Sequence, residues 1–543
     1  MTLPINRLPS EVLSAIFIVV RNNHQYDPME PPDRHWIRVT HVSCHWRAVA
    51  LGCRVLWSEV NLKLKTSWKD YGGTMAMMRR AESAPLRLYI NYEQPLGPGN
   101  MALKIWPQPS KGSTTDACSV TPRVESLIMH GYEKKKEDLR RAMTLYLPHL
   151  RSCRMSDPPD TLAEFDWSKL RSLAYAKSSI DWSSAMLQSP RDLRSLEVEM
   201  DLQDVWVDIP TNYAGNVIGD LGQIANLLAR HPQLQELALL DSLPSWTTED
   251  DIRQVHAIVY PRMAHLDIAH QDFRAARFVL RLLRLPVTCR VGLALRPSIL
   301  HKDVEIPQPA DWLQLWQLVF EREISLDPAA APPRYAVMKI ACREESKGIW
   351  DVELRAFMSQ GAASAHSELL LPSMPAKDVA AHLAWIRDPF AALSVSTLVV
   401  DLHTERRNTE WLAVTKKMTS VHTVRINAIG WDLSEMVAFL APVEGHADSV
   451  LPNMHTLVLT DGDIHTRPGD MRAFPATEAR EEIKAFGAAL RDRVVDGRLR
   501  ELHINCVMHA RLAEGWLTAL ETALPGLKIN WVWGREEVEV LQR

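Results

Sequence analysis

A six-residue pattern recurs along most of this chain and limits the folds that the chain can adopt. The first, fourth and sixth residues of each hexad are apolar, so the last two can face one side of a short strand. Ten hexads fit, and they begin at Val124, Leu150, Leu170, Leu193, Leu234, Met263, Val395, Val421, Met454 and Leu499. Because aliphatic residues form about a quarter of the sequence, chance alone would supply roughly ten such hexads. The pattern therefore needs support from its context.

Proline gives that support. Six of the ten hexads have a proline one to three residues upstream, where about two are expected from the proline content. Proline stops a preceding helix and biases the residue before it toward extended backbone. Amphipathic segments stand where this argument requires helices, at residues 217–230, 273–285, 433–440 and 483–494. The predicted repeating unit is a helix, a proline, a short strand and a loop.

The spacing of the hexads is irregular. Apart from the gap after Ile268, they lie 20 to 45 residues apart, whereas leucine-rich repeats span about 20 to 29 residues. No asparagine ladder follows them. We therefore expect an irregular leucine-rich-repeat-like α/β solenoid over residues 63–543, with a surface loop near 94–122 and no assignable repeats near 296–390. The register predicts burial on short parallel strands for Leu196, Leu237, Leu266, Leu457 and Leu502.

The first 60 residues carry a helical pattern instead. Ser10 can cap a helix whose apolar residues recur at helical spacing, namely Val12, Leu13, Ile16, Phe17 and Val20. A polar segment with three prolines follows, and helical spacing resumes over residues 36–51, as one helix or a bent pair. Val55 and Trp57 then alternate as in an extended segment. A helical block of about 50 residues buries too small a fraction of its surface to be stable alone, so we expect it to pack against a partner.

Three spaced elements in this block, Leu8-Pro9 with Ile16-Phe17, Val42 with Trp46-Arg47, and Leu56-Trp57, occur in the order typical of an F-box. Residues 5–60 resemble this domain, as found in basidiomycete F-box proteins with degenerate leucine-rich-repeat-like C-terminal regions. The resemblance implies a small all-α F-box domain over residues 1–62. It also implies docking onto the Skp-type adaptor of a cullin ligase scaffold, with partner-binding residues Leu8, Pro9, Ile16, Phe17, Val42 and Trp46. The alternative is that these residues pack only on their own chain.

The charged and metal-ligating residues favour no enzymatic site. A net charge of -4, from 62 Lys and Arg against 66 Asp and Glu, gives no general attraction to nucleic acid or anionic membrane. The common phosphate-loop, dinucleotide-binding, metalloprotease and hydrolase motifs are absent. His41 and His45 flank Cys44 at helical spacing, but no further ligand stands near them. The basic run 134–136 and the acidic run 249–251 are typical of a solvated helix face and a helix start.

The same properties bear on compartment and class. The longest apolar stretches are about half of the roughly 20 residues that cross a bilayer, and the seven cysteines are scattered without C-x-x-C pairs. These features predict an intracellular protein, cytoplasmic or nuclear, with reduced thiols. The leading hypothesis is a non-enzymatic substrate-recognition adaptor of an SCF-type ubiquitin ligase that binds an unknown substrate protein. A leucine-rich-repeat-like interaction scaffold unrelated to ubiquitin is the alternative, and an enzyme of unrecognised type comes third.

A first prediction follows from the absence of catalytic and ligand constellations. We expect the purified protein to carry no stoichiometric metal and to need no cofactor. Elemental analysis before and after chelator treatment measures this directly. A zinc ion that survives the chelator would contradict the prediction.

Overall fold

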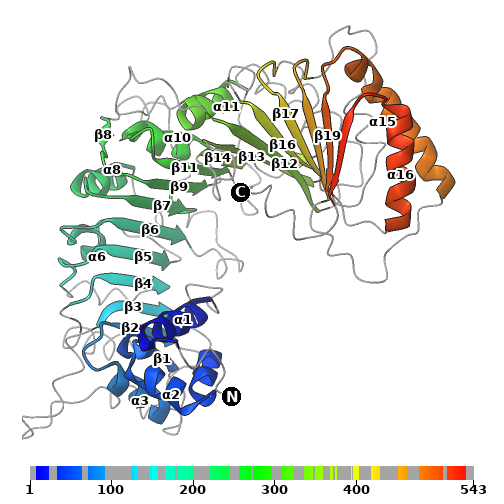
Figure 1. Ribbon diagram of the computed structural model, residues 1–543. Coiled ribbons are helices and arrows are strands. Elements are labelled where there is room, and N and C mark those ends of the chain that lie inside the picture. Colours follow the sequence, from blue (N-terminus) through cyan, green and yellow to red (C-terminus); the bar gives the residue numbers. More distant parts are fainter. Residues whose placement is uncertain are drawn as a thin grey trace, which may run out of the picture. The chain divides into compact units, whose positions relative to one another are not determined.

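The computed structural model is a mixed α/β fold with a large, mostly parallel sheet, and it divides into two compact units, Met1–Pro244 and Ser245–Arg543 (Figure 1). The residues that the structure describes are 8–23, 34–63, 71–91, 124–130, 147, 149–156, 166–177, 182–200, 221–243, 256–270, 273–295, 309–321, 335–346, 349–358, 367–370, 374–375, 393, 395–402, 418–428, 451–461, 476–505 and 510–532. The predicted loop near 94–122 and the predicted helix at 433–440 lie outside them.

The first unit begins with helices and continues as a series of strands. Its helices are α1 (Ser10–Asn23), the 3-10 helix η2 (Arg34–His41), α2 (Cys44–Gly52), the 3-10 helix η3 (Arg54–Trp57), α3 (Tyr71–Ala81), α6 (Ala185–Gln188) and α8 (Leu221–Arg230). Its strands are β1 (Glu59–Lys63), β2 (Leu86–Asn91), β3 (Val124–His130), β4 (Ser152–Ser156), β5 (Ser172–Lys177), β6 (Ser195–Met200) and β7 (Glu236–Leu240). Each strand pairs in parallel with the next, in chain order, as Figure 1 shows.

The second unit contains longer strands, and β13 pairs antiparallel with β12, β14 and β15. Its strands are β8 (Ile258–Val259), β9 (His265–His270), β10 (Leu283–Arg284), β11 (Arg290–Leu295), β12 (Val337–Ser346), β13 (Ile349–Phe357), β14 (Ser367–Leu370), β15 (Met374–Pro375), β16 (Thr397–Leu402), β17 (Thr423–Ala428), β18 (Thr456–Asp461), β19 (Glu501–Asn505) and β20 (Lys528–Val532). Its helices are α10 (Phe273–Leu282), α11 (Pro309–Trp316), the π-helical turn η8 (Gln317–Glu321), α15 (Ala476–Val495) and α16 (Ala510–Ala523).

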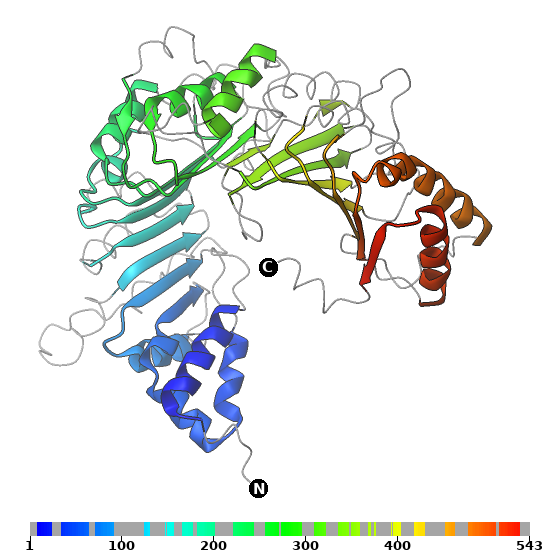
Figure 2. The same ribbon diagram turned by 45° about the horizontal axis from the view of Figure 1, so that its top comes forward.

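The strands of the second unit pair in the order β9, β11, β14, β13, β12, β16, β17, β18, β19, β20. Only the steps from β14 to β13 and from β13 to β12 in this order are antiparallel. Helices α15 and α16 lie side by side (Figure 2). Gly487 permits their close approach, because a Cβ at that position would lie 2.6 Å from the Cβ of Ala523.

All ten hexads form strands, β3 to β7, β9 and β16 to β19. The five leucines predicted to be buried are at most 1% exposed, and every one lies on a strand with a parallel neighbour. That prediction is confirmed. The apolar first residue of each hexad is also buried, and in nine of the ten it lies two residues before the strand starts. These first residues therefore add to the buried core at the start of the strands.

The fourth hexad residues stack across the sheet in unbroken columns. In the first unit Leu127 pairs with Cys153, Cys153 with Leu173, Leu173 with Leu196 and Leu196 with Leu237. Burial raises the pKa of the Cys153 thiol, which keeps it neutral inside this apolar column. We call these stacks, and the equivalent column through Leu398, Val424, Leu457 and Leu502 in the second unit, the apolar ladders.

A repeated backbone contact fixes the register of the ladders. The carbonyl of the second hexad residue accepts hydrogen bonds from two successive N–H groups at the start of the next strand. The Arg171 oxygen accepts from Arg194 N at 2.7 Å and from Ser195 N at 3.0 Å. The His422 oxygen likewise accepts from His455 N and Thr456 N. A slip of one residue would break both bonds and turn the ladder residues to the opposite face.

Two expectations need correction. Residues 54–57 form the 3-10 helix η3 instead of an extended segment, so Val55 is 49% exposed while Trp57 is 1% exposed. With about three residues per turn, residues two apart point in different directions. The sheet is also not wholly parallel, because β12 and β13 form an antiparallel pair of ten-residue and nine-residue strands. Long alternating strands replace the hexads there, which explains why no repeats are assignable near 296–390.

The division into two units places the N-terminal helices and the first strands together. The N-terminal helices belong to the same unit as β1 to β7, since η3 packs on both α3 and β1.

Among the described residues no helix is both long enough and apolar enough to span a bilayer.

The apolar ladders predict a large stability difference between two neighbouring residues of β18. Leu457 is 0% exposed and Thr456 is half-buried on the opposite face. We expect Leu457→Ala to lower the free energy of unfolding by about 2 to 5 kcal/mol, and Thr456→Ala to change it by less than about 0.5 kcal/mol. Denaturant titration of both variants measures the difference. Equal effects would contradict the ladder.

Candidate partner-binding surface

Helix α1 is apolar on two faces, and only one of them packs on the protein. Leu13 and Phe17 are 0% exposed, whereas Val12, Ile16 and Val19 are 43%, 39% and 55% exposed. The three exposed residues are four and three positions apart, a spacing that aligns them along one side of a helix. We call Val12, Ile16 and Val19 the α1 ridge.

Other exposed apolar residues stand in the same block. Ten large apolar side chains are exposed in the described part of the chain, and six of these belong to residues 12–55. Besides the α1 ridge they are Val42, Leu51 and Val55. Single exposed apolar residues are ordinary, but a concentration in one short block marks a candidate interaction surface.

The turn before α1 completes this region. Leu8 is half-buried and Pro9 is exposed. The Pro9 carbonyl accepts a hydrogen bond from Leu13 N at 3.1 Å, so the turn is tied to the first turn of the helix. The conformation of the Leu8-Pro9 turn is therefore fixed relative to the α1 ridge.

Helix α2 packs against the buried face of α1. Ser43 is its N-cap, and the Ser43 hydroxyl accepts a hydrogen bond from Trp46 N at 3.1 Å. Trp46 is half-buried and lies 5.2 Å, centroid to centroid, from the Phe17 ring. The aromatic contact and the cap together set the position of α2 against the buried face of α1.

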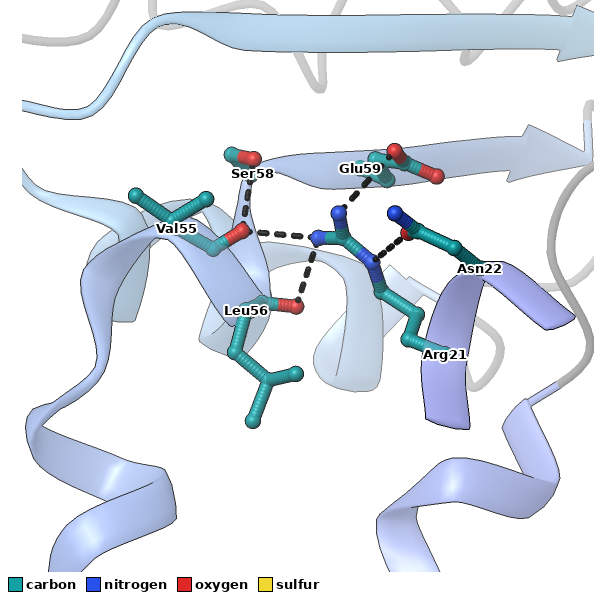
Figure 3. A network of polar contacts seen from close by, with 6 residues as sticks. All are labelled: Arg21, Asn22, Val55, Leu56, Ser58 and Glu59. Carbon is teal, nitrogen blue, oxygen red and sulfur yellow. Dashed lines mark hydrogen bonds and ion pairs between the residues drawn. The ribbon is translucent and has the colours of Figure 1, made fainter. Parts of the chain in front are cut away.

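A buried arginine fastens the end of α1 to the sheet. Figure 3 shows the Arg21 guanidinium donating to the Val55 carbonyl at 2.8 Å and to the Leu56 carbonyl at 3.4 Å. Arg21 also pairs with Glu59 at 3.3 Å, and the two side chains are only 5% and 10% exposed. Since Glu59 begins β1, one side chain joins the last turn of α1 to η3 and to the first strand.

Leu56 and Trp57 make the apolar part of the same junction. Leu56 is 0% exposed, and the Trp57 indole N–H donates to the Ala50 carbonyl at 2.7 Å. Trp36 lies edge-on to Trp57 at 5.0 Å, and the Arg80 guanidinium covers the Trp57 ring at 4.4 Å. The N-terminal helices, β1 and α3 therefore share one core, as the helices in blue beside the first strands illustrate in Figure 2.

The structure separates the six predicted partner-binding residues into three groups by exposure. Pro9, Ile16 and Val42 are exposed, and Leu8 and Trp46 are half-buried. Phe17 is completely buried against Trp46, so its ring has no surface to offer a partner. Phe17 therefore lies beneath the α1 ridge as a supporting residue in this structure, and its assignment to partner binding stays a prediction.

Sequence reasoning missed two features of this region. The helical spacing does not separate Val12 from the buried residues of α1 and does not include Val19, because spacing alone does not tell which of two apolar faces is covered. The sequence assigns no role to Arg21, since nothing near it in the chain reveals partners 34 to 38 residues away.

The described residues assemble no metal centre. They contain no group of three or more His, Cys, Asp or Glu side chains that could hold an ion. Cys44, His41 and His45 are each exposed. The basic run 134–136 and the acidic run 249–251 lie outside the described residues.

Comparison with known proteins adds no assignment. No protein-family model matches the chain, and no curated protein matches it either.

The Arg21 junction makes a direct prediction about stability. Arg21→Met would leave the Glu59 carboxylate buried without its cation, and we expect the free energy of unfolding to fall by about 3 to 5 kcal/mol. Thermal or denaturant unfolding measures the loss. Adding Glu59→Leu to this variant should recover part of it, because the unpaired carboxylate is then removed.

A matched exposed pair provides the control. Arg54 lies 2.6 Å from Glu82, with side chains 54% and 57% exposed. Arg54→Met should change stability by less than about 1 kcal/mol. If Arg54→Met lowered the free energy of unfolding as much as Arg21→Met, burial would not explain the contribution of the Arg21–Glu59 pair to stability.

Proposed function

We propose that the protein is the substrate-recognition adaptor of an SCF-type ubiquitin ligase. In this proposal the N-terminal helices act as an F-box that docks onto a Skp-type adaptor of the cullin scaffold. The remaining strands and helices act as an irregular leucine-rich-repeat-like α/β solenoid that binds a substrate protein. The ubiquitin-transfer chemistry belongs to the partners.

The α1 ridge is the observation that carries the proposal. An amphipathic helix that lies in an apolar groove of its partner makes contact through residues at spacings of three and four. Val12, Ile16 and Val19 have this spacing and leave a large part of their apolar surface in water. Docking would remove that surface from water at about 25 cal/mol per Å². The fixed Leu8-Pro9 turn adds a second contact at the start of the helix.

The strand arrangement supports the substrate-binding half of the proposal. Strands β1 to β7 pair in chain order, and their apolar ladders place equivalent residues side by side. Successive units that contact mainly their neighbours are typical of repeat proteins, which use the exposed face of the stack for binding. The irregular spacing of the hexads would give this chain a binding surface of its own.

A scaffold unrelated to ubiquitin remains the second candidate. The complete burial of Phe17 against Trp46 is what favours it, because this contact gives the F-box-like residues a role inside the chain. Only the adaptor requires a Skp-type protein to bind at the α1 ridge. Direct binding of a purified Skp-type adaptor therefore separates them.

The docking proposal predicts loss of binding without loss of folding. We expect a Leu8→Ala, Pro9→Ala double variant, and separately Ile16→Asp, to abolish capture of a purified Skp-type adaptor. Each apolar anchor at the centre of an interface is worth at least about 2 kcal/mol, or roughly thirtyfold in affinity. The melting temperature should change little, since Pro9 and Ile16 are exposed and Leu8 is only half-buried.

Two further variants make this test decisive. Val495 ends α15 and is 78% exposed, so Val495→Asp should leave capture unchanged. Phe17→Ala should instead lower stability by about 3 to 5 kcal/mol, because it empties a buried position. Unchanged capture by the Ile16→Asp variant, or capture that falls only together with the melting temperature, would favour the scaffold.

A further inference from the structure

Two histidines lie next to each other where the chain enters β17 and β18. Four side chains form a row at the start of neighbouring strands, the second hexad residues of β16 to β19, namely Ser396, His422, His455 and Arg500. The backbone carbonyl of each member accepts a hydrogen bond from the N–H of the next, over 2.8 to 2.9 Å. His422 and His455 are therefore one strand apart and held in register by the backbone.

The two imidazole rings are close in space as well. Their centroids are 5.4 Å apart, and the ring planes are inclined by 32°. His422 is exposed and His455 is half-buried. Both rings are therefore within reach of a dissolved ion.

A backbone carbonyl determines which nitrogen of His455 carries the hydrogen. His455 Nδ1 lies 2.9 Å from the Arg498 carbonyl oxygen. Because a carbonyl oxygen only accepts hydrogen bonds, Nδ1 is the donor, and the lone pair of the neutral ring is then on Nε2. Histidines that bind metals commonly donate their other nitrogen to a backbone carbonyl in this way. His455 Nε2 therefore has the electron pair and the fixed orientation of a metal ligand.

The separation of the rings matches a tetrahedral ion. Zinc lies about 2.0 to 2.1 Å from a coordinating nitrogen, which places it about 3.2 Å from the centroid of each ring. Two rings at the tetrahedral angle then have centroids about 5.2 Å apart, whereas the right angle of a square-planar site gives about 4.5 Å. The observed 5.4 Å is close to the tetrahedral value.

Two arginines stand near the pair and have contacts of their own. Arg498 pairs with Asp496 at 2.7 Å, and Arg500 Nε donates to the Gly497 carbonyl at 3.5 Å. These contacts hold both guanidinium groups at the turn before β19. The Asp496 carboxylate also offsets one of the two positive charges, which lowers the repulsion that an arriving cation meets.

We propose that His422 and His455 bind a zinc ion through their Nε2 atoms, with water in the other two positions of a tetrahedral site. Zinc binds neutral imidazole nitrogen and has no electronic preference against the tetrahedral arrangement. Because His422 is exposed, its ring can turn about its side-chain bonds to direct Nε2 at the ion.

The site is weaker than an ordinary metal centre. Catalytic zinc sites have three protein ligands and structural sites have four, whereas this pair supplies two. A chelator therefore removes the ion, and the purified protein is still expected to be free of stoichiometric metal.

This site extends beyond the adaptor proposal and does not depend on it. The two histidines lie in the second unit, whereas the docking residues lie in the first. Loss of adaptor capture leaves the zinc site untouched, and loss of zinc binding leaves adaptor capture untouched.

The first test titrates zinc chloride into the full-length, untagged, chelator-treated protein by isothermal calorimetry. His422→Asn and His455→Asn should each weaken zinc binding at least about tenfold, the lower end of the loss caused by removing a mere second-shell partner. Asparagine can still donate to a carbonyl, but its amide does not replace the imidazole nitrogen as a ligand. His256→Asn is the matched control, since His256 is exposed in the same unit, and it should bind zinc as the wild type does.

Two outcomes of the titration would overturn the proposal. Equal zinc affinity of the wild type and both asparagine variants would show that the pair binds no zinc. A loss in only one of the two variants would show that the ion is not shared between the rings.

Thermal melting separates loss of the site from loss of the fold. Without metal, both asparagine variants should melt close to the wild type, because neither ring is fully buried. Added zinc should raise the melting temperature of the wild type and of His256→Asn, because it binds the folded state, and leave the two variants unchanged. The same rise in His422→Asn would overturn the proposal.

Discussion

The apolar ladders are the constraint on which the rest of this protein depends. Each ladder residue is buried by equivalent residues on the two neighbouring strands, so every strand needs its neighbours to complete its core. The paired N–H groups at the entrances of most ladder strands, such as β6 and β18, hold the register that makes this stacking possible. Once the register is fixed, the alternation of the strand leaves the other face free for polar residues such as Arg154, Glu197 and Arg425.

The N-terminal helices use the same principle at the end of the series. Leu56 and Trp57 continue the buried core, and Arg21 adds polar contacts where the backbone carbonyls of η3 need partners. Helix α1 is apolar on two sides, and only one of them is buried by this packing. One face of α1 therefore packs in the core, and the α1 ridge on the other face stays exposed.

The parts of the structure encoded by local pattern were predictable, and the parts encoded by distant contacts were not. Leu196 and Leu457 could be placed on buried strands because proline and hexad spacing act within a few residues. Ile16 and Phe17 could not be told apart, since neighbouring positions of a helix with two apolar faces look alike until Trp46 covers one of them. Arg21 could not be assigned to the junction, because its partners lie 34 to 38 residues further along the chain.

The Arg21 junction has a mechanical consequence for the first unit. Buried contacts, the Arg21–Glu59 ion pair among them, join α1 to η3 and to β1 and so hold the ridge against the first strand. Strands β1 to β7 then follow in fixed order at about 4.8 Å per step. A molecule held on the ridge and a molecule held on a chosen strand would be kept at a set separation. The number of strands between the two binding positions in the first unit would then set the distance between the two bound molecules.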